Sequence, residues 1–548
     1  MCIQKHLSKF LIPVIAAGLL AAGAGVLYAG DSAAEFKKQK GGFYTDLFDQ
    51  NIYYEGTNYL HLERLWRGIS GKKLPASDVN RYDEVPDSLF FTNRHARTRL
   101  SEKALAEGYR ETAGPDWSKL VTIISADVEE GHLLFYVRDA KGDDYQLRFD
   151  VSENFELATS AEVIASRFYY AIGYNVPQYT VEIFEASKLV LDPNAFIYDE
   201  SGFRGKFTPE RLEEALMAMP LDPQGRHRVS ACKIPAGSDK GKFSFHGRRA
   251  DDAQDGILHK DRREIRALLV FASWLNNTDV REGNTKDLFL DEKGNKVLKH
   301  YLVNFRSSLG SGGDGTKPPE FGHENLIDYG QVAKSFVTLG LFDDPWQKRW
   351  ESQGEKPHPS PAVGYFDNLY FEPGAFKTVF PNFAFKDMTR ADAFWAAKIV
   401  KSFTNEDLRT MVGAGKLTDP KDAEYVTTTL LNRRDLLAKY WFSQASPLDD
   451  FQLKGEKLTF TDLGVETGLW NPEGNQYSAE IFEMGGKKPK KVSSLESTET
   501  SFDLQNLLAG DKTTAVSIRT LRTKTPSSGP SVMVEISGGR ITAVAHED

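Results

Sequence analysis

Cysteine is nearly absent from this sequence. The chain has two cysteines, Cys2 and Cys232, and the first lies in an apolar leader, so the body of the chain carries a single thiol. One thiol excludes a disulfide within the body and a cysteine-ligated zinc cluster. We expect Cys232 to be a small buried hydrophobe rather than a nucleophile.

Common enzyme motifs and an excess of positive charge are also missing. The sequence contains no H-E-x-x-H and no G-x-S-x-G, the motifs of zinc peptidases and serine hydrolases. The eleven histidines are scattered, and we interpret His259, His300 and His323 as structural residues. The formal net charge is -9. Because nucleic acid attracts proteins with a basic field, we expect no nucleic-acid partner.

The chain starts with an apolar leader. Lys5 and Lys9 precede the uncharged stretch 10–29, and a small residue, Ala29, stands at its end. This pattern is typical of a secretory signal peptide, and the stretch is also long enough to span a bilayer. We therefore predict that residues 1–29 are either a cleaved signal peptide or a retained N-terminal anchor. Either way the body lies outside the cytoplasm, as a periplasmic or secreted protein or one held at the inner membrane by residues 10–29.

The body has the composition of a well-packed globular protein, with 40% hydrophobic and 12% aromatic residues. Residues 30–115 are mixed and polar, and we expect them to be an extension that packs on the main body. Three alternating stretches then predict a β-meander: Val121–Ser125, His132–Val137 and Tyr145–Phe149. An apolar stripe of helical period predicts a helix over Ser160–Ile172, and Gly173 ends it.

The pattern is mainly helical over residues 186–450 and changes afterwards. Helices are expected at Phe207–Met219, Arg262–Trp274, Met388–Phe403 and Asp422–Phe442. Beyond residue 450, short alternating stretches are separated by Gly, Pro and Lys turns. They predict a separate small β-domain over residues 451–548, with strands at 457–463, 477–482, 514–520, 532–536 and 541–544.

The densest chemical signal lies in the middle of the chain. Asp279 is followed five residues later by Asn284, and a β-hairpin is predicted over residues 288–305. A hairpin of this length returns Asn304 to the neighbourhood of Asn284. The spacing is similar to that of protein kinases, in which D-x-x-x-x-N supplies a base and a metal ligand and D-F-G supplies the other ligand.

Four longer stretches extend this likeness: residues 83–93 (D-E-V-P-D-S-L-F-F-T-N), 158–177, 247–310 and 381–400. Together they resemble a bacterial family of exported proteins with a kinase-like core of the HipA-like and secretory-pathway type. The resemblance implies an α+β fold with a two-lobed kinase-like core. Its N-lobe is expected over residues 116–185 and its mainly helical C-lobe over 186–450, followed by the β-sandwich-like domain.

The resemblance also implies roles for single residues. Glu162 on the helix would hold Arg148 on the last meander strand, and Arg148 would contact the phosphate of a bound cofactor. Asp279 would be the catalytic base. Asn284 and Asn304 would stand in the metal-ligand positions. The cofactor implied is ATP with Mg²⁺ or Mn²⁺.

The sequence departs from the family pattern at several of these positions. The family usually has Lys at the position of Arg148 and Asp at that of Asn304, often has His at that of Asn277, and has Gly at that of Arg306. An amide oxygen can coordinate Mg²⁺ but brings no charge, whereas the metal neutralises charge on the phosphates during transfer. We expect the loss of one such ligand to slow phosphate transfer by roughly 10² to 10⁴.

Three functions stay open on the sequence alone. The first is an exported pseudokinase, a binding or scaffold protein with a cleft for a nucleotide or another phosphorylated ligand and an unknown partner in the envelope. The second is an active atypical kinase that uses Asp279 as base and takes a metal ligand from Asp287 or Asp314. The third is a structural protein of the cell envelope that uses the β-domain for interaction.

Overall fold

The computed structural model of the chain describes residues 43–54, 73–108, 114–129, 132–199, 203–292, 295–339, 341, 344, 346–347, 360–369, 371–485, 488–508, 512–522 and 530–547. All of them belong to one compact unit, Lys38–Asp548. The predicted leader, residues 1–29, lies outside the described residues, so its two alternatives stay predictions. In the described part of the chain, no helix is both long and apolar enough to cross a membrane.

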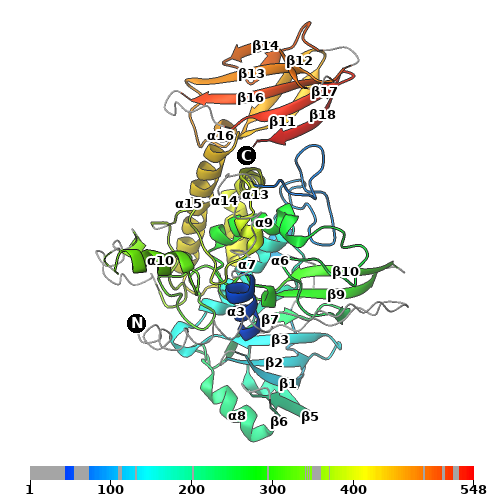
Figure 1. The fold of residues 1–548 in the computed structure, drawn as a ribbon. Helices are drawn as coiled ribbons and strands as arrows, with labels where there is room; N and C mark the ends of the chain where they lie inside the picture. Colours follow the sequence, from blue (N-terminus) through cyan, green and yellow to red (C-terminus); the bar gives the residue numbers. More distant parts are fainter. Residues whose placement is uncertain are drawn as a thin grey trace. The chain divides into compact units, whose positions relative to one another are not determined.

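A seven-stranded sheet follows the N-terminal extension (Figure 1). Its strands are β1 (Val121–Glu129), β2 (His132–Arg138), β3 (Asp144–Phe149), β4 (Gln178–Phe184), β5 (Leu189–Tyr198), β6 (Arg204–Lys206) and β7 (His227–Lys233). The order is β4-β7-β3-β2-β1-β5-β6, and neighbours are antiparallel except for the parallel pair β1 and β5. The predicted meander is β1–β3, and β5–β7 continue the sheet past residue 185.

Strand β3 shows how alternation sorts side chains between the two faces of this sheet. Tyr145, Leu147 and Phe149 are buried in one apolar core, against which residues of α8 (Pro209–Ala218) pack. Arg148 belongs to the opposite set and lies beside Ser230 of β7 in the strand register. Helix α7 packs on that face. The alternation therefore directs Arg148 toward α7.

Helix α7 (Leu157–Ile172) is buried along nearly its whole length. It begins three residues before the predicted start because Asp150, at the end of β3, caps it. The Asp150 carboxylate accepts hydrogen bonds from the backbone N–H groups of Glu156 (3.0 Å) and Thr159 (2.9 Å). Gly173 ends the helix as predicted, at φ 146°.

The hairpin predicted after Asn284 is present as β9 (Thr285–Glu292) and β10 (Asn295–Leu302), with the short strand β8 (Ser238–Asp239) beside β9. The second strand ends at Leu302, three residues earlier than predicted. The reason is Asn304, which has a left-handed backbone with φ 60° and whose N–H donates to the hydroxyl of Tyr179 instead of to a strand partner.

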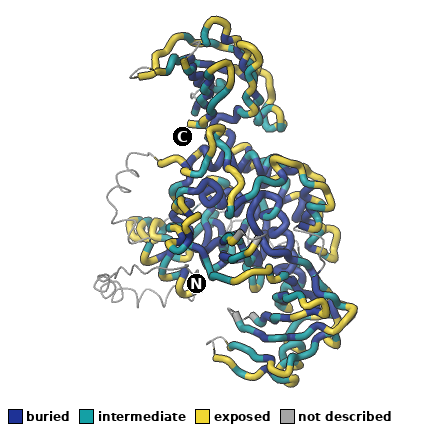
Figure 2. Tube along the Cα trace, turned by 90° about the vertical axis from the view of Figure 1, so that its right-hand side faces the viewer, coloured by how far each residue is buried: buried dark blue, intermediate teal, exposed yellow. Residues whose placement is uncertain are grey.

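Four helices pack with α7 around one apolar core: α9 (Arg263–Leu275), α13 (Arg390–Ser402), α14 (Asn405–Gly413) and α15 (Pro420–Gln444). Figure 2 shows the buried segments of this core in dark blue in the central part of the view. Trp274 and Trp395 are fully buried within it. Further helices are α3 (Phe43–Phe48), the π-helix Asp49–Tyr54, α6 (Glu102–Glu107), α10 (Tyr329–Val337), α12 (Phe383–Lys386) and α16 (Leu463–Glu466).

The C-terminal part consists of two antiparallel sheets, drawn in orange and red in Figure 1. One contains β11 (Leu448–Lys454), β12 (Lys457–Asp462) and β15 (Ser501–Asp503). The other has the order β14-β13-β16-β17-β18, made by β13 (Asn475–Glu483), β14 (Lys490–Ser497), β16 (Thr514–Arg522), β17 (Val532–Ser537) and β18 (Arg540–His546). Apolar side chains of both sheets share one core. The prediction of an α+β protein that ends in a β-sandwich-like domain is confirmed.

Candidate functional site

The first two predicted site residues meet between the sheet and α7. Nη1 of Arg148 on β3 lies 3.7 Å from Oε1 of Glu162 on α7, which is within ion-pair distance as the sequence predicted. Glu162 is fully buried, whereas the Arg148 side chain is 18% exposed. A ligand can therefore reach this pair only from the guanidinium side.

Two residues without a predicted role complete the surroundings of Glu162. Ser230 on β7 donates a hydrogen bond to Oε2 of Glu162, and Nη1 of Arg306 lies 3.9 Å from the same oxygen. Burial lowers the pKa of Arg306, while the charges of Glu162 and Asp150 oppose that effect. The carboxylate of Glu162 thus lies between two guanidinium groups, those of Arg148 and Arg306.

Arg306, which replaces the glycine of the kinase pattern, is a structural cross-link. Its Nη2 donates to the carbonyl oxygens of Phe149 (2.7 Å), at the end of β3, and Gly313 (3.1 Å). These bonds join the sheet to the glycine-rich loop that comes after the hairpin. The sequence marked this position only as a departure from the family.

A chain of side-chain hydrogen bonds connects Arg148 to the remaining predicted residues. Nη1 of Arg148 donates to Oδ1 of Asn304 (2.8 Å), and Nδ2 of Asn304 donates to Oδ1 of Asn284 (2.9 Å). Nδ2 of Asn284 donates in turn to Oδ2 of Asp279 (2.8 Å). All five predicted site residues, Glu162 included, are therefore in one network, while the role of each in chemistry stays a prediction.

The donor set of this network does not fit a divalent metal ion. Both amide oxygens in the predicted ligand positions, those of Asn284 and Asn304, already accept hydrogen bonds from protein groups. The group on the Asn304 oxygen is the guanidinium of Arg148, a cation that would repel a metal ion at the same place. Mg²⁺ prefers anionic oxygen, and among the described residues no three His, Cys, Asp or Glu side chains gather as a metal site requires.

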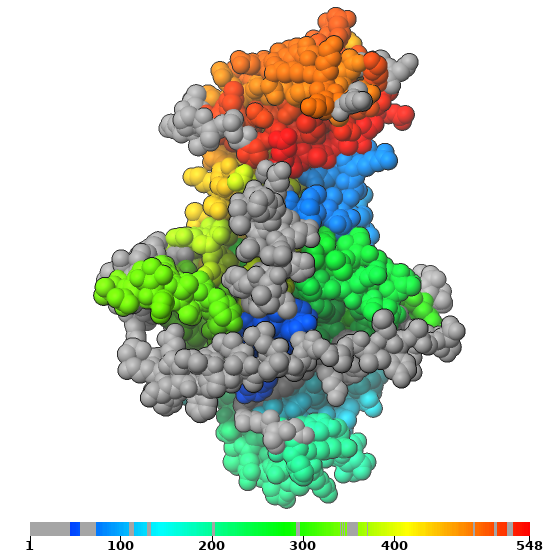
Figure 3. Space-filling model, in the orientation of Figure 1, coloured from blue at the N-terminus to red at the C-terminus, as the bar shows by residue number. Residues whose placement is uncertain are grey.

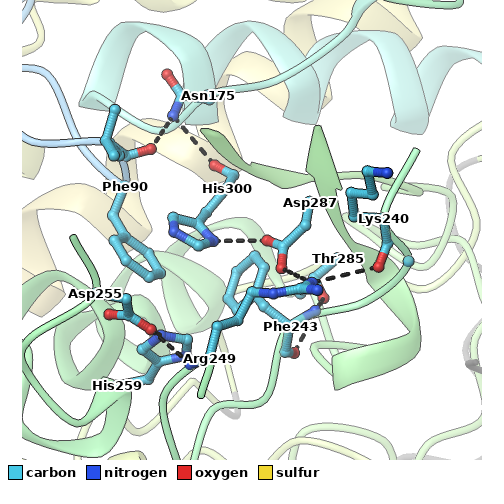
Figure 4. A network of polar contacts seen from close by, with 12 residues as sticks. Phe90, Asn175, Lys240, Phe243, Arg249, Asp255, His259, Thr285, Asp287 and His300 are labelled. Carbon is cyan, nitrogen blue, oxygen red and sulfur yellow. Dashed lines mark hydrogen bonds and ion pairs between the residues drawn. The ribbon is translucent and has the colours of Figure 1, made fainter. Parts of the chain in front are cut away.

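Asp287, one of the two carboxylates considered as a replacement ligand, belongs to a different network (Figure 4). It is fully buried and accepts hydrogen bonds from Nδ1 of His300 (2.6 Å) and Nη1 of Arg249 (2.7 Å). In the same network Nε2 of His259 lies 2.7 Å from a carboxylate oxygen of Asp255. Burial lowers the pKa of His300. Both oxygens of Asp287 are thus in use, and His259 and His300 have the structural environment that the sequence predicted.

Asp279, the predicted base, is held by a neighbouring arginine. Nε of Arg281 donates to Oδ1 of Asp279 (2.9 Å), while Oδ2 accepts from Asn284. A cavity of about 10 Å³ adjoins Asp279, Asn284 and Asn304, which is room for about one water molecule. The Asp279 side chain is 19% exposed, so a larger ligand would have to approach it from its solvent side.

Asp46 is a residue of this region that could not be found from the sequence, because it lies in the polar extension, where no motif marks it. It comes from α3, is fully buried, and its Oδ2 accepts the backbone N–H of Gly283 (2.7 Å). Nζ of Lys242 lies 2.6 Å from Oδ1, and Nη1 of Arg281 lies 3.4 Å from Oδ2. Gly283 is required here, since a Cβ at this position would meet Oδ2 of Asp46 at 2.3 Å.

No known family and no curated protein matches this chain. Among solved structures, it is similar to the crystal structure of a Helicobacter pylori proinflammatory kinase, CtkA. The identity is 12%, the match covers 56% of this chain and 91% of that chain, and the TM-score is 0.28.

A second similar protein is the Golgi casein kinase. The identity is 9%, the match covers 62% of this chain and 74% of that chain, and the TM-score is 0.26. The same kinase crystallised with Mn and ADP gives 9% identity, 62% and 73% coverage and a TM-score of 0.26. Likenesses at this level carry no argument about the function of this chain, which has to be inferred from the contacts among its own residues.

Proposed function

We propose that this protein is a kinase-like binding protein that acts outside the cytoplasm and holds a nucleotide or another phosphorylated ligand without transferring its phosphate. The observation that carries the proposal is the hydrogen bond from the guanidinium of Arg148 to the side-chain oxygen of Asn304. In the kinase pattern that oxygen would ligate the metal. In this chain an arginine of the protein supplies the positive charge there.

The charges around Glu162 favour an anionic ligand. Two guanidinium groups, those of Arg148 and Arg306, flank the carboxylate of Glu162, and the charge of Asp150 also acts on Arg306, so Arg148 is the cation that an anionic ligand would meet. A guanidinium can bind a phosphate through two parallel hydrogen bonds. Arg148, the more exposed of the two, is the group that would make them. Since ATP is scarce outside the cytoplasm, a phosphorylated molecule other than ATP fits the proposal equally well.

We expect phosphate transfer to be lost because of two features of the site: the contacts of the predicted base, Asp279, and the side chains in the metal-ligand positions, Asn284 and Asn304. The carboxylate of Asp279 is engaged by Arg281 and Asn284, so both of its oxygens already accept a hydrogen bond. The side chains in the two predicted metal-ligand positions, Asn284 and Asn304, are uncharged amides. Both effects raise the barrier for phosphate transfer without weakening the contact between Arg148 and a phosphate. We therefore expect the protein to bind the phosphorylated ligand without transferring its phosphate.

The test is thermal unfolding of the purified protein with ATP, once with a metal chelator and once with Mg²⁺ or Mn²⁺. We expect ATP to stabilise the protein in the presence of chelator, by about 2.7 kcal/mol at 100 times its Kd. Arg148→Met is expected to abolish the shift. The control Arg138→Met removes an exposed arginine of β2 that pairs with Asp144, and it is expected to leave the shift unchanged.

Two outcomes would contradict the proposal. A shift that requires metal, together with phosphate incorporation that Asp279→Ala abolishes, would establish the active kinase. If neither ATP nor a panel of phosphorylated sugars and nucleotides shifts the unfolding temperature at millimolar concentration, the cleft binds no such ligand. Deletion of residues 455–548 and then partner capture would test the structural role of the β-domain.

A further inference from the structure

A cavity of about 620 Å³ lies between α8 and the first residues of β5. Leu212 and Leu216 of α8 line it on one side, and Leu189 and Leu191 of β5 line it on the other. These four side chains belong to the apolar core on the α8 side of the sheet or pack against that core, whereas Arg148 belongs to the opposite set of side chains on β3. The cavity is therefore separate from the Arg148 cleft. Figure 3 shows the region of α8 at the surface, in blue-green at the lower end of the view.

The walls of this cavity are apolar but loosely packed. Helix α8 contains no buried residue, although Leu212 and Leu216, one turn apart on the helix, both pack against the core of the sheet. Helix α7, on the other face of the sheet, is buried along nearly its whole length. Protein interiors are normally packed as densely as organic crystals, so a volume of this size is not an ordinary packing defect. It lies within the range of small-molecule sites, which is roughly 300–1,000 Å³.

The residues around the cavity favour an uncharged ligand. Among the described residues that line it there is no lysine or arginine that could pair with a carboxylate or a phosphate, and the one acidic side chain is that of Glu213. His227 also lines the cavity and is buried. Burial lowers the pKa of His227, and its ring packs against the rings of Phe149 and Phe184. An anion in this cavity would therefore meet a carboxylate and no cation, which is unfavourable.

A small molecule fits the cavity better than a second copy of the chain or another protein. Of the described large apolar side chains that line it, two are more than half exposed: Met217 at 75% and Leu221 at 52%. Stable protein interfaces bury roughly 1,200–2,000 Å² in total, and two side chains do not supply such an area. Most of the apolar surface lies inside the hollow, where a small ligand reaches it and the surface of a folded partner does not.

We propose that α8 and β5 form a binding site for an uncharged, largely hydrocarbon small molecule, and that this ligand completes the packing of α8 against the sheet. The inference goes beyond the proposed function, because this ligand carries no phosphate and binds on the other face of the sheet from Arg148. It does not require Arg148 to bind a phosphate, so the two proposals can fail separately.

The test is a titration of the full chain with N-phenyl-1-naphthylamine, an uncharged dye that fluoresces in apolar surroundings, followed by displacement with hexanol, octanol and decanol. We expect each added methylene to tighten binding of the alcohol about threefold to fourfold, and we expect ATP and inorganic phosphate not to displace the dye. Leu216→Trp fills part of the cavity and is expected to weaken dye binding by roughly tenfold, because the bound dye would overpack the site. Ala218→Trp changes an exposed residue of the same helix that does not line the cavity. It is the matched control and is expected to change nothing.

Three results would overturn the inference: an affinity that does not depend on the length of the alcohol, displacement of the dye by phosphate, or equal dye binding by Leu216→Trp and the unaltered protein. Dye binding that falls as sedimentation shows dimers would assign the cavity to a second copy of the chain instead. A measurement on the unaltered protein guards against a variant that folds poorly. Hydrogen exchange in residues 209–218 is expected to slow when octanol is added, and unchanged exchange there would also count against the inference. Thermal shifts with ATP on the same samples report on the Arg148 cleft, so their absence counts only against the proposed function.

Discussion

At the scale of single residues, Arg148 connects two parts of the candidate site. Its guanidinium reaches Glu162 on α7 and Asn304 after the hairpin. Asn304 in turn donates to Asn284, the last residue of the predicted catalytic loop 279–284. A lysine at this place would offer one ammonium group with a different geometry. Arg148 and Asn304 therefore act together, since the guanidinium donates to the amide oxygen, and we expect the two departures from the kinase pattern to depend on each other.

Glu162 is expected to stabilise the fold because its carboxylate lies between two guanidinium groups. Glu162→Gln keeps the shape but removes the negative charge that both Arg148 and the buried Arg306 approach, so we expect a loss of about 3 kcal/mol in the free energy of unfolding. Urea unfolding measures it. The control Glu480→Gln breaks an exposed ion pair with Lys491 and is expected to cost less than about 1 kcal/mol. Equal losses in the two variants would show that the charge of Glu162 contributes no more than an exposed one.

The departures at positions 148 and 304 predict the result of reversing them. We expect the double variant Arg148→Lys with Asn304→Asp to gain a Mg²⁺-dependent thermal shift with ATP, because it places an uncompensated carboxylate oxygen in the metal position. Asn304→Asp alone is expected to show none, since its carboxylate would pair with the guanidinium of Arg148. If the double variant stays insensitive to metal, Arg148 and Asn304 are not what prevents metal binding in this chain.

At the scale of elements, the sequence predicted what has a local signature and missed what does not. The meander, α7 and the hairpin after Asn284 are explained by alternation, an apolar stripe and turn residues. Strand β7, H-R-V-S-A-C-K, went unpredicted although it lies between β3 and β4. Two of its polar residues are buried and find partners in other elements: Arg228 donates to Thr159 and to the carbonyl of Gly415, and Ser230 donates to Glu162.

Prediction of the site is limited in the same way, because a contact between residues far apart in the sequence has no local signature. Arg148, Glu162, Asp279, Asn284 and Asn304 could be named because a known spacing relates them. Asp46 and Ser230 could not, because only the folded chain brings them close to the others. Their partners lie 237 residues away for the bond between Asp46 and Gly283 and 68 residues away for that between Ser230 and Glu162.

The end of α7 gives a prediction for one element. Gly173 has φ 146°, and a Cβ there would meet the ring of Phe91 at 2.3 Å. Gly142, in the turn between β2 and β3, has φ 84° and nothing within 4 Å of such a Cβ. Alanine at Gly142 is expected to cost about 1 kcal/mol from backbone strain alone. Alanine at Gly173 adds overpacking and is expected to cost about 1–3 kcal/mol more in urea unfolding. Similar costs at the two positions would rule out a steric role for Phe91.

At the scale of the whole molecule, the C-terminal sheets are connected to the rest of the described chain through polar contacts. These contacts could not be predicted from the sequence. Nζ of Lys398 on α13 lies 2.6 Å from a carboxylate oxygen of Asp449 on β11. The backbone N–H of Val544 on β18 donates to the carbonyl of Arg81 (2.8 Å). The sequence indicated a separate small domain because its strand pattern is self-contained. The extension around Asp83 provides part of the connection.

Asp83 makes this connection dependent on pH. Its carboxylate contacts Nδ1 of His546 on β18 (2.8 Å) and a guanidinium nitrogen of Arg263 on α9. Burial alone would raise the pKa of Asp83, but the hydrogen bond from His546 and the charge of Arg263 outweigh it and lower the pKa to about 2. A folded-state pKa below the unfolded value of about 3.9 stabilises the fold above pH 4 and stops doing so as the pH falls toward 2.

The size of this effect can be measured by unfolding Asp83→Asn beside the unaltered protein. The shift in pKa corresponds to about 2 kcal/mol at pH 7, so the variant is expected to be less stable by about that amount. At pH 3 the difference is expected to be roughly half as large, because the carboxylate is then partly protonated in the unfolded chain. Asp144→Asn, which breaks the exposed pair with Arg138, is the control and is expected to show a small difference at both pH values. A difference for Asp83 that stays constant from pH 7 to pH 3 would mean that its charge does not help to hold β18 against the extension.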